Sequence, residues 1–393
     1  MTSAILGFDH RPQTRIVFGL NTIDTIGELA RELSCRRALI VTDIHIVAAG
    51  HVARACRALA AAGVEVVIFD GVRENPTTVD VNTCLEAARS SGCDLLIGMG
   101  GGSSMDTAKG CNFLLTNGGE MRDYWGVGKA TKEMLPLIAV PTTAGTGSEC
   151  QSFALIADAT THQKMACGDP KAAPRVALLD PNLTVSQPHS VAACTGMDAL
   201  SHAIETAVTR RRSELSLLYS REAFRLTINN LLRVLDDPEN LESRAEMLLG
   251  AAYAGIAIEN SMLGAAHSAA NPLTAHFGVV HGQAVGMMLP HVVRCNAAQP
   301  EARRTYRDLA VSAGLTSSNT SDELAVEALA TGLQERFEKA GMPSSLRDCG
   351  VQEENLPLLA AEASTQWTAQ FNPRSLTVDD FEALYRSALQ NAD

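Results

Sequence analysis

The feature that most constrains the fold is an alternation of short β-rich runs with alanine-rich helical stretches in the first half of the chain. Strands are expected at residues 36–43, 64–72, 93–104 and 134–143, and helices at 51–63 and 79–92. Strands that alternate with helices in this way predict a parallel sheet covered by helices on both faces. The first half therefore predicts a Rossmann-like α/β domain.

The character of the sequence changes from about Ser190 onward. Strand-like runs almost vanish, and stretches such as 213–235 space their apolar residues at helical intervals. We place a boundary near Pro188, and the 393 residues are enough for two domains with large cores. The prediction is an α/β domain over residues 1–188 and an all-helical domain over residues 189–393.

Composition excludes several functional classes. The net charge of −12 provides no basic field for a phosphate backbone, so we expect no nucleic-acid partner. The longest uncharged stretch, 260–293, contains Pro272, Pro290 and several histidines, which favours buried core or active site over a membrane span. The start of the chain has no basic segment followed by an apolar run, and the ten cysteines form no Cys-x-x-Cys pair, so we expect a cytoplasmic protein.

A glycine-rich segment, Gly98–Gly110, follows one expected strand and opens a helix. Glycines allow backbone N–H groups to approach an anion, and the start of a helix adds partial positive charge. Ser103, Ser104 and Thr107 could donate hydroxyls, and we expect Lys109 to add charge nearby. A plain tight turn is the alternative. The segment also lies two strands later than the usual Gly-x-Gly-x-x-Gly turn, which predicts a different nucleotide-binding architecture.

A second polar turn, Val140–Glu149, also follows an expected strand. Thr142, Thr143 and Thr146 offer hydroxyl and backbone donors there. Either turn alone is weak evidence, whereas two such turns at strand ends of one sheet predict a dinucleotide site.

Asp43 ends the first expected strand. A carboxylate in this place can accept hydrogen bonds from an adenosine ribose and repel a 2′-phosphate. The alternative is an N-cap for the segment that follows, and the residue on its own favours the cap.

Asp198 and His202 stand four residues apart in a helical stretch, so both side chains share one helix face. A carboxylate and an imidazole so placed form half of a site for a divalent metal. The alternative is a simple Asp–His hydrogen bond, and this pair on its own favours the hydrogen bond.

His267 and His281 lie downstream in the uncharged stretch, where a buried imidazole must be paired or bound to a metal. With the Asp–His pair they would form an N₃O donor set, which suits Fe²⁺, Zn²⁺, Mn²⁺ or Co²⁺. His276 is a spare candidate for the site. His291 follows Pro290 and is expected to be structural.

At these residues the sequence resembles the iron-containing (group III) alcohol dehydrogenase family. The motifs that carry the resemblance are GGGSSMDTAK, PTTAGTGSE, LLDPNLT, TGMDALSHAIE and the block from His267 to His281. The resemblance extends from Ile16–Gly19 to Asn372–Leu389. It implies a dehydroquinate-synthase-like fold and an NAD-linked alcohol dehydrogenase or aldehyde reductase. It also implies one divalent metal, Fe²⁺ before Zn²⁺, and a homodimer acting on a small alcohol or aldehyde.

The resemblance also assigns site residues. It implies that the metal is bound by Asp198, His202, His267 and His281, the last of which is also catalytic. It implies that the dinucleotide is held by Gly101, Gly102, Ser103, Asp106, Thr142, Thr143 and Thr146, and flanked by Lys164 and Leu183. Asp43 matches a position where aspartate accompanies NAD rather than NADP, which reverses the preference for a simple cap.

One position departs from the family pattern. Many members have His-x-x-x-His where this chain has His267 and Asn271. Asn271 is one helical turn from His267 and cannot titrate, so we expect it to orient substrate or nicotinamide ribose rather than to move protons. The alternative is a residue that ends a helix before Pro272.

The expected reaction is hydride transfer between nicotinamide C4 and the substrate carbon, with the metal polarising the substrate oxygen. The sequence leaves two other functions open. A lyase of dehydroquinate-synthase type would need a cluster of lysines and arginines for a phosphorylated substrate, and the uncharged stretch disfavours it. A non-catalytic NAD-binding protein is disfavoured because all four expected metal ligands are present.

Overall fold

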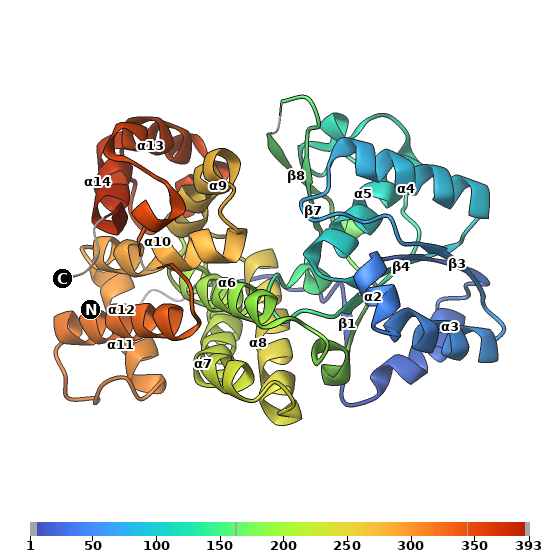
Figure 1. Ribbon diagram of the computed structural model, residues 1–393, viewed down its shortest axis with the longest axis horizontal. Helices are drawn as coiled ribbons and strands as arrows, with labels where there is room; N and C mark the ends of the chain where they lie inside the picture. The colour runs from blue at the N-terminus through green and yellow to red at the C-terminus, as the bar shows by residue number, and fades with distance from the viewer. Residues whose placement is uncertain (1–5, 162, 344, 390–393) are drawn as a thin grey trace. The chain divides into compact units, whose positions relative to one another are not determined.

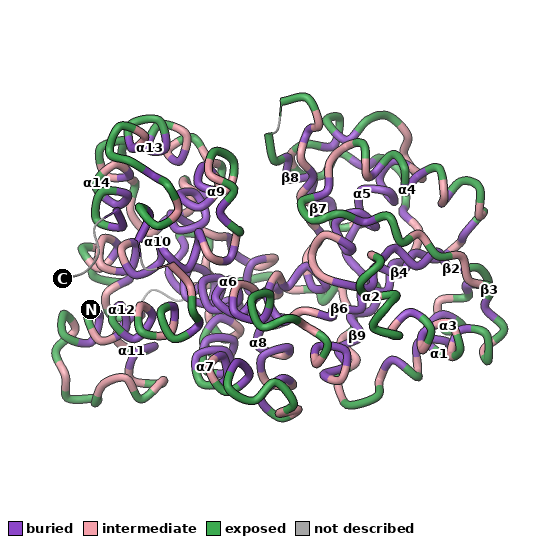
Figure 2. The backbone as a smooth tube through the Cα atoms, in the orientation of Figure 1, coloured by how far each residue is buried: buried purple, intermediate pink, exposed green. Residues whose placement is uncertain are grey.

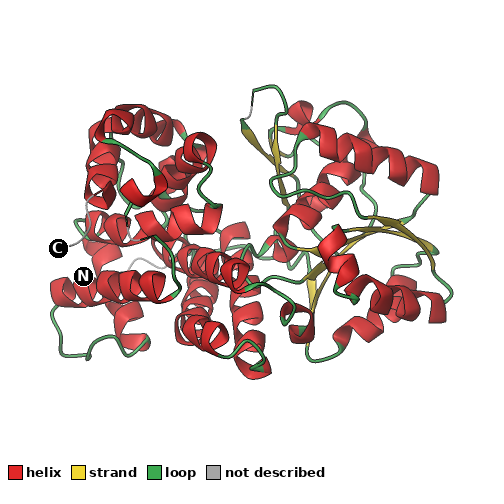
Figure 3. Cartoon of the chain, viewed as in Figure 1, coloured by secondary structure: helices red, strands yellow, loops and turns green. Residues whose placement is uncertain are grey.

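The computed structural model describes residues 6–161, 163–343 and 345–389. Their contacts divide the chain into two compact units. One is His10–Gln187, and the other contains the described residues from Pro188 onward together with those before His10. The strands lie in the first unit, and the second consists of helices and loops (Figure 3).

A six-stranded sheet forms the centre of the first unit, in the order β1-β9-β6-β4-β2-β3. Its strands are β1 (Arg15–Phe18), β2 (Arg37–Val41), β3 (Glu65–Phe69), β4 (Leu95–Gly100), β6 (Leu137–Pro141) and β9 (Val176–Leu179). Each neighbouring pair is parallel, so the predicted parallel sheet is confirmed. The four expected strands correspond to β2, β3, β4 and β6.

Helices cover both faces of this sheet (Figure 1). They are α1 (Ile26–Glu32), α2 (Ile44–Ala48), α3 (His51–Ala61), α4 (Thr78–Ser91) and α5 (Gly102–Asn117). Successive side chains of a strand point to opposite faces. In β2, Leu39 and Val41 therefore join the core formed with α4 and α5, whereas Ala38 and Ile40 join the core formed with α1 and α3. Burial on both faces explains why β2 and β4 are nearly continuous apolar runs.

A second, three-stranded sheet was not expected from the sequence. It contains β5 (Gly126–Val127), β8 (Lys164–Gly168) and β7 (Phe153–Ala157), in that order. β7 and β8 are antiparallel, and β5 joins β8 in parallel. The sequences FALIA of β7 and KMACG of β8 contain alanine, lysine and glycine, which are depleted in strands. Short 3₁₀ helices complete the unit: η1 (Thr22–Thr25), η2 (Met121–Tyr124), η3 (Ser148–Cys150), η4 (Pro170–Ala172) and η5 (Pro181–Thr184).

The second unit is helical, as predicted. Its helices are α6 (His189–Val208), α7 (Glu214–Asp236), α8 (Leu241–Glu259), α9 (Ala265–Phe277), α10 (His281–Asn296), α11 (Pro300–Ser312), α12 (Asp322–Lys339), α13 (Leu356–Thr365) and α14 (Val378–Leu389). The 3₁₀ segments are η6 (Arg347–Cys349), η7 (Glu353–Asn355) and η8 (Trp367–Phe371). α6 is buried over most of its length and packs against α7, α8 and α10 (Figure 2). Within the described residues, no helix is both long and apolar enough to cross a membrane.

Neither proline of the uncharged stretch ends a helix. Pro272 lies inside α9 and Pro290 inside α10. The alternative in which Asn271 ends a helix before Pro272 is therefore wrong. A proline inside a helix costs a hydrogen bond, but most of α9 is buried and packs against α10 and α13, and this packing outweighs the local preference.

Candidate functional site

Three helices of the second unit bring the four expected metal ligands together. Asp198 and His202 lie on α6, His267 on α9, and His281 at the first position of α10. Asp198 Oδ1 lies 3.4 Å from His202 Nε2, 3.5 Å from His267 Nε2 and 3.8 Å from His281 Nε2. Tetrahedral ligand atoms about 2.1 Å from one ion are about 3.4 Å apart, so these distances fit a shared cation.

The four residues are not equally close. Ligand atoms of Asp198, His267 and His281 all lie within 4.8 Å of one another. His202 joins them through Asp198, and its ring stacks on that of His267 with 4.8 Å between centroids. The separation of four residues between Asp198 and His202 thus places both side chains at one centre.

Two buried atoms without a hydrogen-bond partner favour a cation at this centre. Asp198 Oδ1 and His267 Nε2 are buried without a hydrogen-bond partner, which is costly unless another species satisfies them. Burial would raise the pKa of Asp198, but His202, His267 and His281 hold it below its ordinary value. Burial would also lower the pKa of His267, but Glu205 and Asp198 outweigh it and raise that pKa to about 9. A positive charge is thus favoured at this centre, and a divalent metal that replaces the proton of His267 would supply it.

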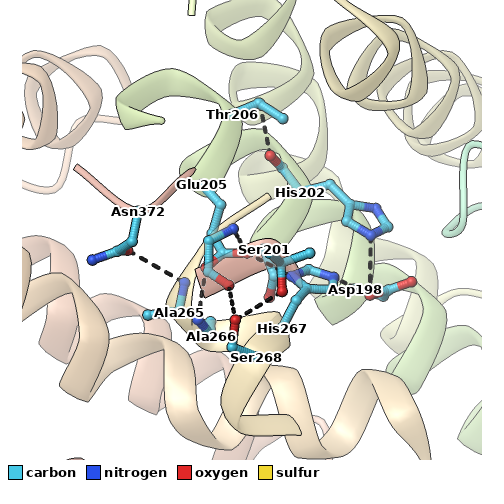
Figure 4. A network of polar contacts seen from close by, with 12 residues as sticks. Asp198, Ser201, His202, Glu205, Thr206, Ala265, Ala266, His267, Ser268 and Asn372 are labelled. Atoms are coloured by element: carbon cyan, nitrogen blue, oxygen red, sulfur yellow. Dashed lines mark hydrogen bonds and ion pairs between the residues drawn. The ribbon is translucent and has the colours of Figure 1, made fainter. Parts of the chain in front are cut away.

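Glu205 is a contact of this centre that the sequence analysis missed. Its Oε2 lies 2.6 Å from Nδ1 of His267 (Figure 4). Glu205 is seven residues beyond Asp198 and three beyond His202 on α6, so it lies on the same helix face. That spacing was the signal available in the sequence.

The two spare histidines lie outside the cluster. His276 Nε2 pairs with Glu362 Oε2 at 2.8 Å in an exposed contact. His291 Nδ1 contacts Ser387 Oγ at 2.8 Å, and burial lowers the pKa of His291 to about 4. His291 thus connects α10 to α14, in keeping with the structural role expected for it.

Asn271 is half-buried on α9 and has a partner that the sequence did not suggest. Its Nδ2 donates to Gln366 Oε1 at 2.9 Å. Gln366 immediately precedes η8 and is 95 residues away in the chain. No local pattern connects two such distant residues.

In the first unit, the glycine-rich turn between β4 and α5 is tightly constrained. Gly100 has a φ of 147°, and a Cβ there would lie 2.4 Å from Ser104 Oγ. A Cβ at Gly102 would lie 2.9 Å from Thr146 Cγ2. Gly101 is the N-cap of α5 and provides no side chain to satisfy the first amides of the helix. Small residues and open amides are the features that suit a phosphate group.

The second polar turn lies against the first because β6 is the parallel neighbour of β4. Thr142 donates its backbone N–H to Gly100 O at 2.9 Å, and a Cβ at Gly101 would be 3.6 Å from the Thr143 side chain. The hydroxyls of Thr107, Thr142 and Thr143 are buried without a hydrogen-bond partner. Unsatisfied hydroxyls around open helix amides fit a polar ligand such as a dinucleotide.

Lys109, which was expected to add charge near the glycine-rich turn, places its ammonium group in an interior network beside the second polar turn. Its Nζ donates to Ser148 O at 2.7 Å, Ser148 Oγ at 2.8 Å and Phe153 O at 3.0 Å. The side chain is fully buried, because these three oxygens satisfy its charge in the interior. Asp106 is also tied to this interior network: its Oδ1 accepts from Ser148 Oγ at 2.9 Å, and burial raises its pKa.

Asp43 has the capping role that was considered for it, and its second carboxylate oxygen takes no part in the cap. Its Oδ1 accepts from the backbone N–H groups of His45 at 2.8 Å and Ile46 at 3.1 Å, so it caps α2. Its Oδ2 faces the glycine turn, 3.7 Å from where a Cβ on Gly100 would stand. The cap leaves one carboxylate oxygen beside the expected ligand.

The remaining two cofactor candidates differ in exposure. Lys164 is exposed at the start of β8 and acts electrostatically on Asp106. Leu183 is buried in the hydrophobic core with α1 and α3, so it could reach a ligand only through its backbone.

The comparisons with known proteins identify the family of the chain. Residues 12–181 match the family model described as iron-containing alcohol dehydrogenase, and residues 192–389 match the model of the C-terminal region of that family. The chain is 33% identical to an NAD-dependent methanol dehydrogenase of Bacillus methanolicus, covering 95% of this chain and 97% of that protein. It is 36% identical to a lactaldehyde reductase of Escherichia coli K12, covering 94% and 97%. A crystal structure of a 1,3-propanediol oxidoreductase aligns with a TM-score of 0.93 at 32% identity, covering 99% of this chain and 100% of that one.

An α/β unit with two polar turns at the ends of neighbouring strands, and a helical unit with an Asp–His₃ cluster, are the features expected of a metal-dependent oxidoreductase. The chain belongs to the iron-containing alcohol dehydrogenase family. Its activity is that of an alcohol dehydrogenase or aldehyde reductase, which decides against the lyase and the non-catalytic protein.

Proposed function

We propose that the protein is an NAD-linked alcohol dehydrogenase or aldehyde reductase in which Asp198, His202, His267 and His281 hold one divalent ion. The observation that carries the proposal is the approach of three imidazole nitrogens to Asp198 Oδ1 within 3.4–3.8 Å. The N₃O donor set and the family favour Fe²⁺, with Zn²⁺ next.

The same proposal assigns NAD to the first unit. The dinucleotide would be held by Gly101, Gly102, Ser103, Asp106, Thr142, Thr143 and Thr146, with Lys164 and Leu183 beside it. The open amides of α5 suit the pyrophosphate, and Asp43 Oδ2 suits the adenosine ribose.

When bound, the metal would polarise the substrate oxygen and the nicotinamide would carry the hydride. The chain contributes one carboxylate and three imidazoles, so its ligands neutralise only one charge of a divalent cation. Asn271 cannot titrate, so it orients the substrate or the nicotinamide ribose and leaves proton exchange to water or a ribose hydroxyl. His281 serves as ligand at the catalytic centre.

We also propose a homodimer in the cytoplasm that acts on a small alcohol or aldehyde. None of the ten cysteines lies in a disulfide in the structure, which suits a reducing compartment. The dimer follows from the family alone, and light scattering after gel filtration would test it.

The proposed function is tested with metal-free protein prepared by chelation and reloaded under anaerobic conditions with Fe²⁺ or Zn²⁺. A panel of primary alcohols, diols and aldehydes is then assayed by absorbance of NADH. We expect NADH to accumulate with at least one alcohol only in reloaded protein. Equal turnover in the metal-free sample would contradict the assignment of the metal centre.

A further inference from the structure

Glu205 is a buried carboxylate with three acceptor contacts at the start of α9. Its Oε1 accepts from the backbone N–H of Ala266 at 2.7 Å, and its Oε2 accepts from that of Gly264 at 3.1 Å. Oε2 also lies 2.6 Å from His267 Nδ1. Only 4% of the residue is exposed, so water does not compete for these contacts.

These contacts determine which nitrogen of His267 faces the cluster. Both carboxylate oxygens already accept backbone N–H groups, so Glu205 acts toward the imidazole as an acceptor. In the neutral imidazole that binds a metal, Nδ1 of His267 then carries the hydrogen and Nε2, 3.5 Å from Asp198 Oδ1, keeps the lone pair. A carboxylate bound to the far nitrogen of a ligand histidine fixes both the tautomer and the orientation of the ring.

We propose that Glu205 is a positioning residue of the metal centre: it holds His267 in the tautomer and orientation in which Nε2 can bind the ion. The inference rests on the proposed metal centre and extends it to a residue that does not itself contact the ion. Because the same carboxylate accepts two amides at the start of α9, it also ties the ligand to the position of the whole helix.

Asn372 provides a matched control at the same helix end. Its Oδ1 accepts from the backbone N–H of Ala265 at 3.3 Å, and it is buried like Glu205. Its other contacts are with Asn296 and Arg374, and it has no hydrogen bond to His267. Loss of Asn372 therefore disturbs the start of α9 without removing the partner of the imidazole.

The experiment compares Glu205→Gln, Asn372→Ala and His267→Ala with the wild type. Each protein is stripped of metal and titrated with Zn²⁺ in competition with a chromophoric chelator, and the unfolding temperature of the metal-free form is recorded. We expect Glu205→Gln to bind Zn²⁺ about 10- to 100-fold more weakly. Asn372→Ala should unfold at lower temperature and bind Zn²⁺ as the wild type does.

The variants distinguish the positioning role of Glu205 from the existence of the metal centre. Wild-type affinity in Glu205→Gln, with loss in His267→Ala, overturns the inference and leaves the metal centre intact. Wild-type affinity in His267→Ala overturns the metal centre itself. Equal loss of affinity in Glu205→Gln and Asn372→Ala reduces Glu205 to a helix cap and also overturns the inference.

A measurement on the wild type keeps the inference testable if Glu205→Gln does not fold. Nitrogen-15 shifts of the Zn²⁺-loaded protein should show His267 protonated at Nδ1 and metal-bound at Nε2. The reverse assignment would overturn the proposal, since Glu205 would then face the wrong nitrogen.

Discussion

Asn271 Nδ2 donates a hydrogen bond to Gln366 Oε1 across 2.9 Å, one helical turn beyond His267. The contact orients the amide, because it is made by the nitrogen and leaves Oδ1 to accept from another donor. An oxygen acceptor held in this way suits a hydroxyl donor, whether from a substrate alcohol or from a ribose.

Asn271→Leu should retain its metal and lose about 10- to 100-fold in kcat/KM, equivalent to about 1.4–2.8 kcal/mol of lost hydrogen bonding. Asn271→His should introduce a pH dependence near the ordinary imidazole pKa of about 6.5. Steady-state kinetics over the alcohol panel, with metal content measured in parallel, check both variants.

Gln366→Leu is the companion variant. If Gln366 acts by orienting Asn271, the double variant should be no slower than Asn271→Leu alone, since the two residues form one unit. Unchanged kinetics in Asn271→Leu would leave the pair with a purely structural role.

His267→Ala should lose the metal and several orders of magnitude in rate, because Lewis-acid stabilisation contributes several kcal/mol. His276→Ala is the matched control, since His276 lies on the same helix but pairs with Glu362 in an exposed contact. The metal content and the activity of both variants test whether His267 binds the metal. A metal-loaded, active His267→Ala protein is incompatible with the proposed centre.

Replacement of Asp43 should narrow the preference for NAD over NADP by about 1–3 kcal/mol, the size of one charge-assisted contact. Because Asp43 also caps α2, Asp43→Asn is the cleaner variant: it keeps a good cap and removes the charge. Asp43→Gly should show the same change in cofactor preference. The ratio of kcat/KM for the two cofactors is the measurement, and equal use of both by the wild type would refute the role of Asp43.

Glu149 should make folding stability depend on pH. It is buried in η3, with Oε1 unsatisfied, and burial raises its pKa to about 7. A carboxyl whose folded pKa is raised stabilises the fold below its unfolded pKa, and this stability is lost as pH rises through the folded value. Between pH 6 and pH 8 the wild type should lose about 1.4 kcal/mol relative to Glu149→Gln, the worth of one pKa unit.

Urea unfolding of both proteins at pH 6 and pH 8 tests this expectation. Comparison with the glutamine variant cancels the titration of all other groups, because only the carboxyl is removed. A difference in unfolding free energy that is the same at both pH values would show that Glu149 does not titrate in this range.

Gly282→Ala should displace α10 from α6 and weaken metal binding. A Cβ at Gly282 would lie 2.1 Å from the backbone oxygen of Cys194, and Gly282 immediately follows the ligand His281. Overpacking of this kind costs about 1–3 kcal/mol or more. Gly286→Ala on the same helix should be milder, since its nearest contact is the Phe337 ring at 3.0 Å. The unfolding temperature and the metal content of the two variants test whether Gly282→Ala is the more damaging substitution.

Much of the fold could be predicted from the sequence because it depends on local periodicity. The buried runs of β2 and β4, the glycine turn before α5 and the spacing of Asp198 and His202 follow from the geometry of one strand or one helix. The strands β7 and β8 were missed although they are as long as β2, because the alanine, lysine and glycine residues in them are depleted in strands.

The sequence by itself determined the parallel sheet, the helical second half and the residue types able to bind a metal. Only the tertiary structure decided that Lys109 donates to Ser148 and that Glu205 contacts His267. It also decided that α9 continues through Pro272. Each of these depends on which distant segments pack together, and burial then sets whether a charge is satisfied internally or left for a ligand. Local sequence patterns do not predict these contacts, because the partners are brought together only by the packing of the whole unit.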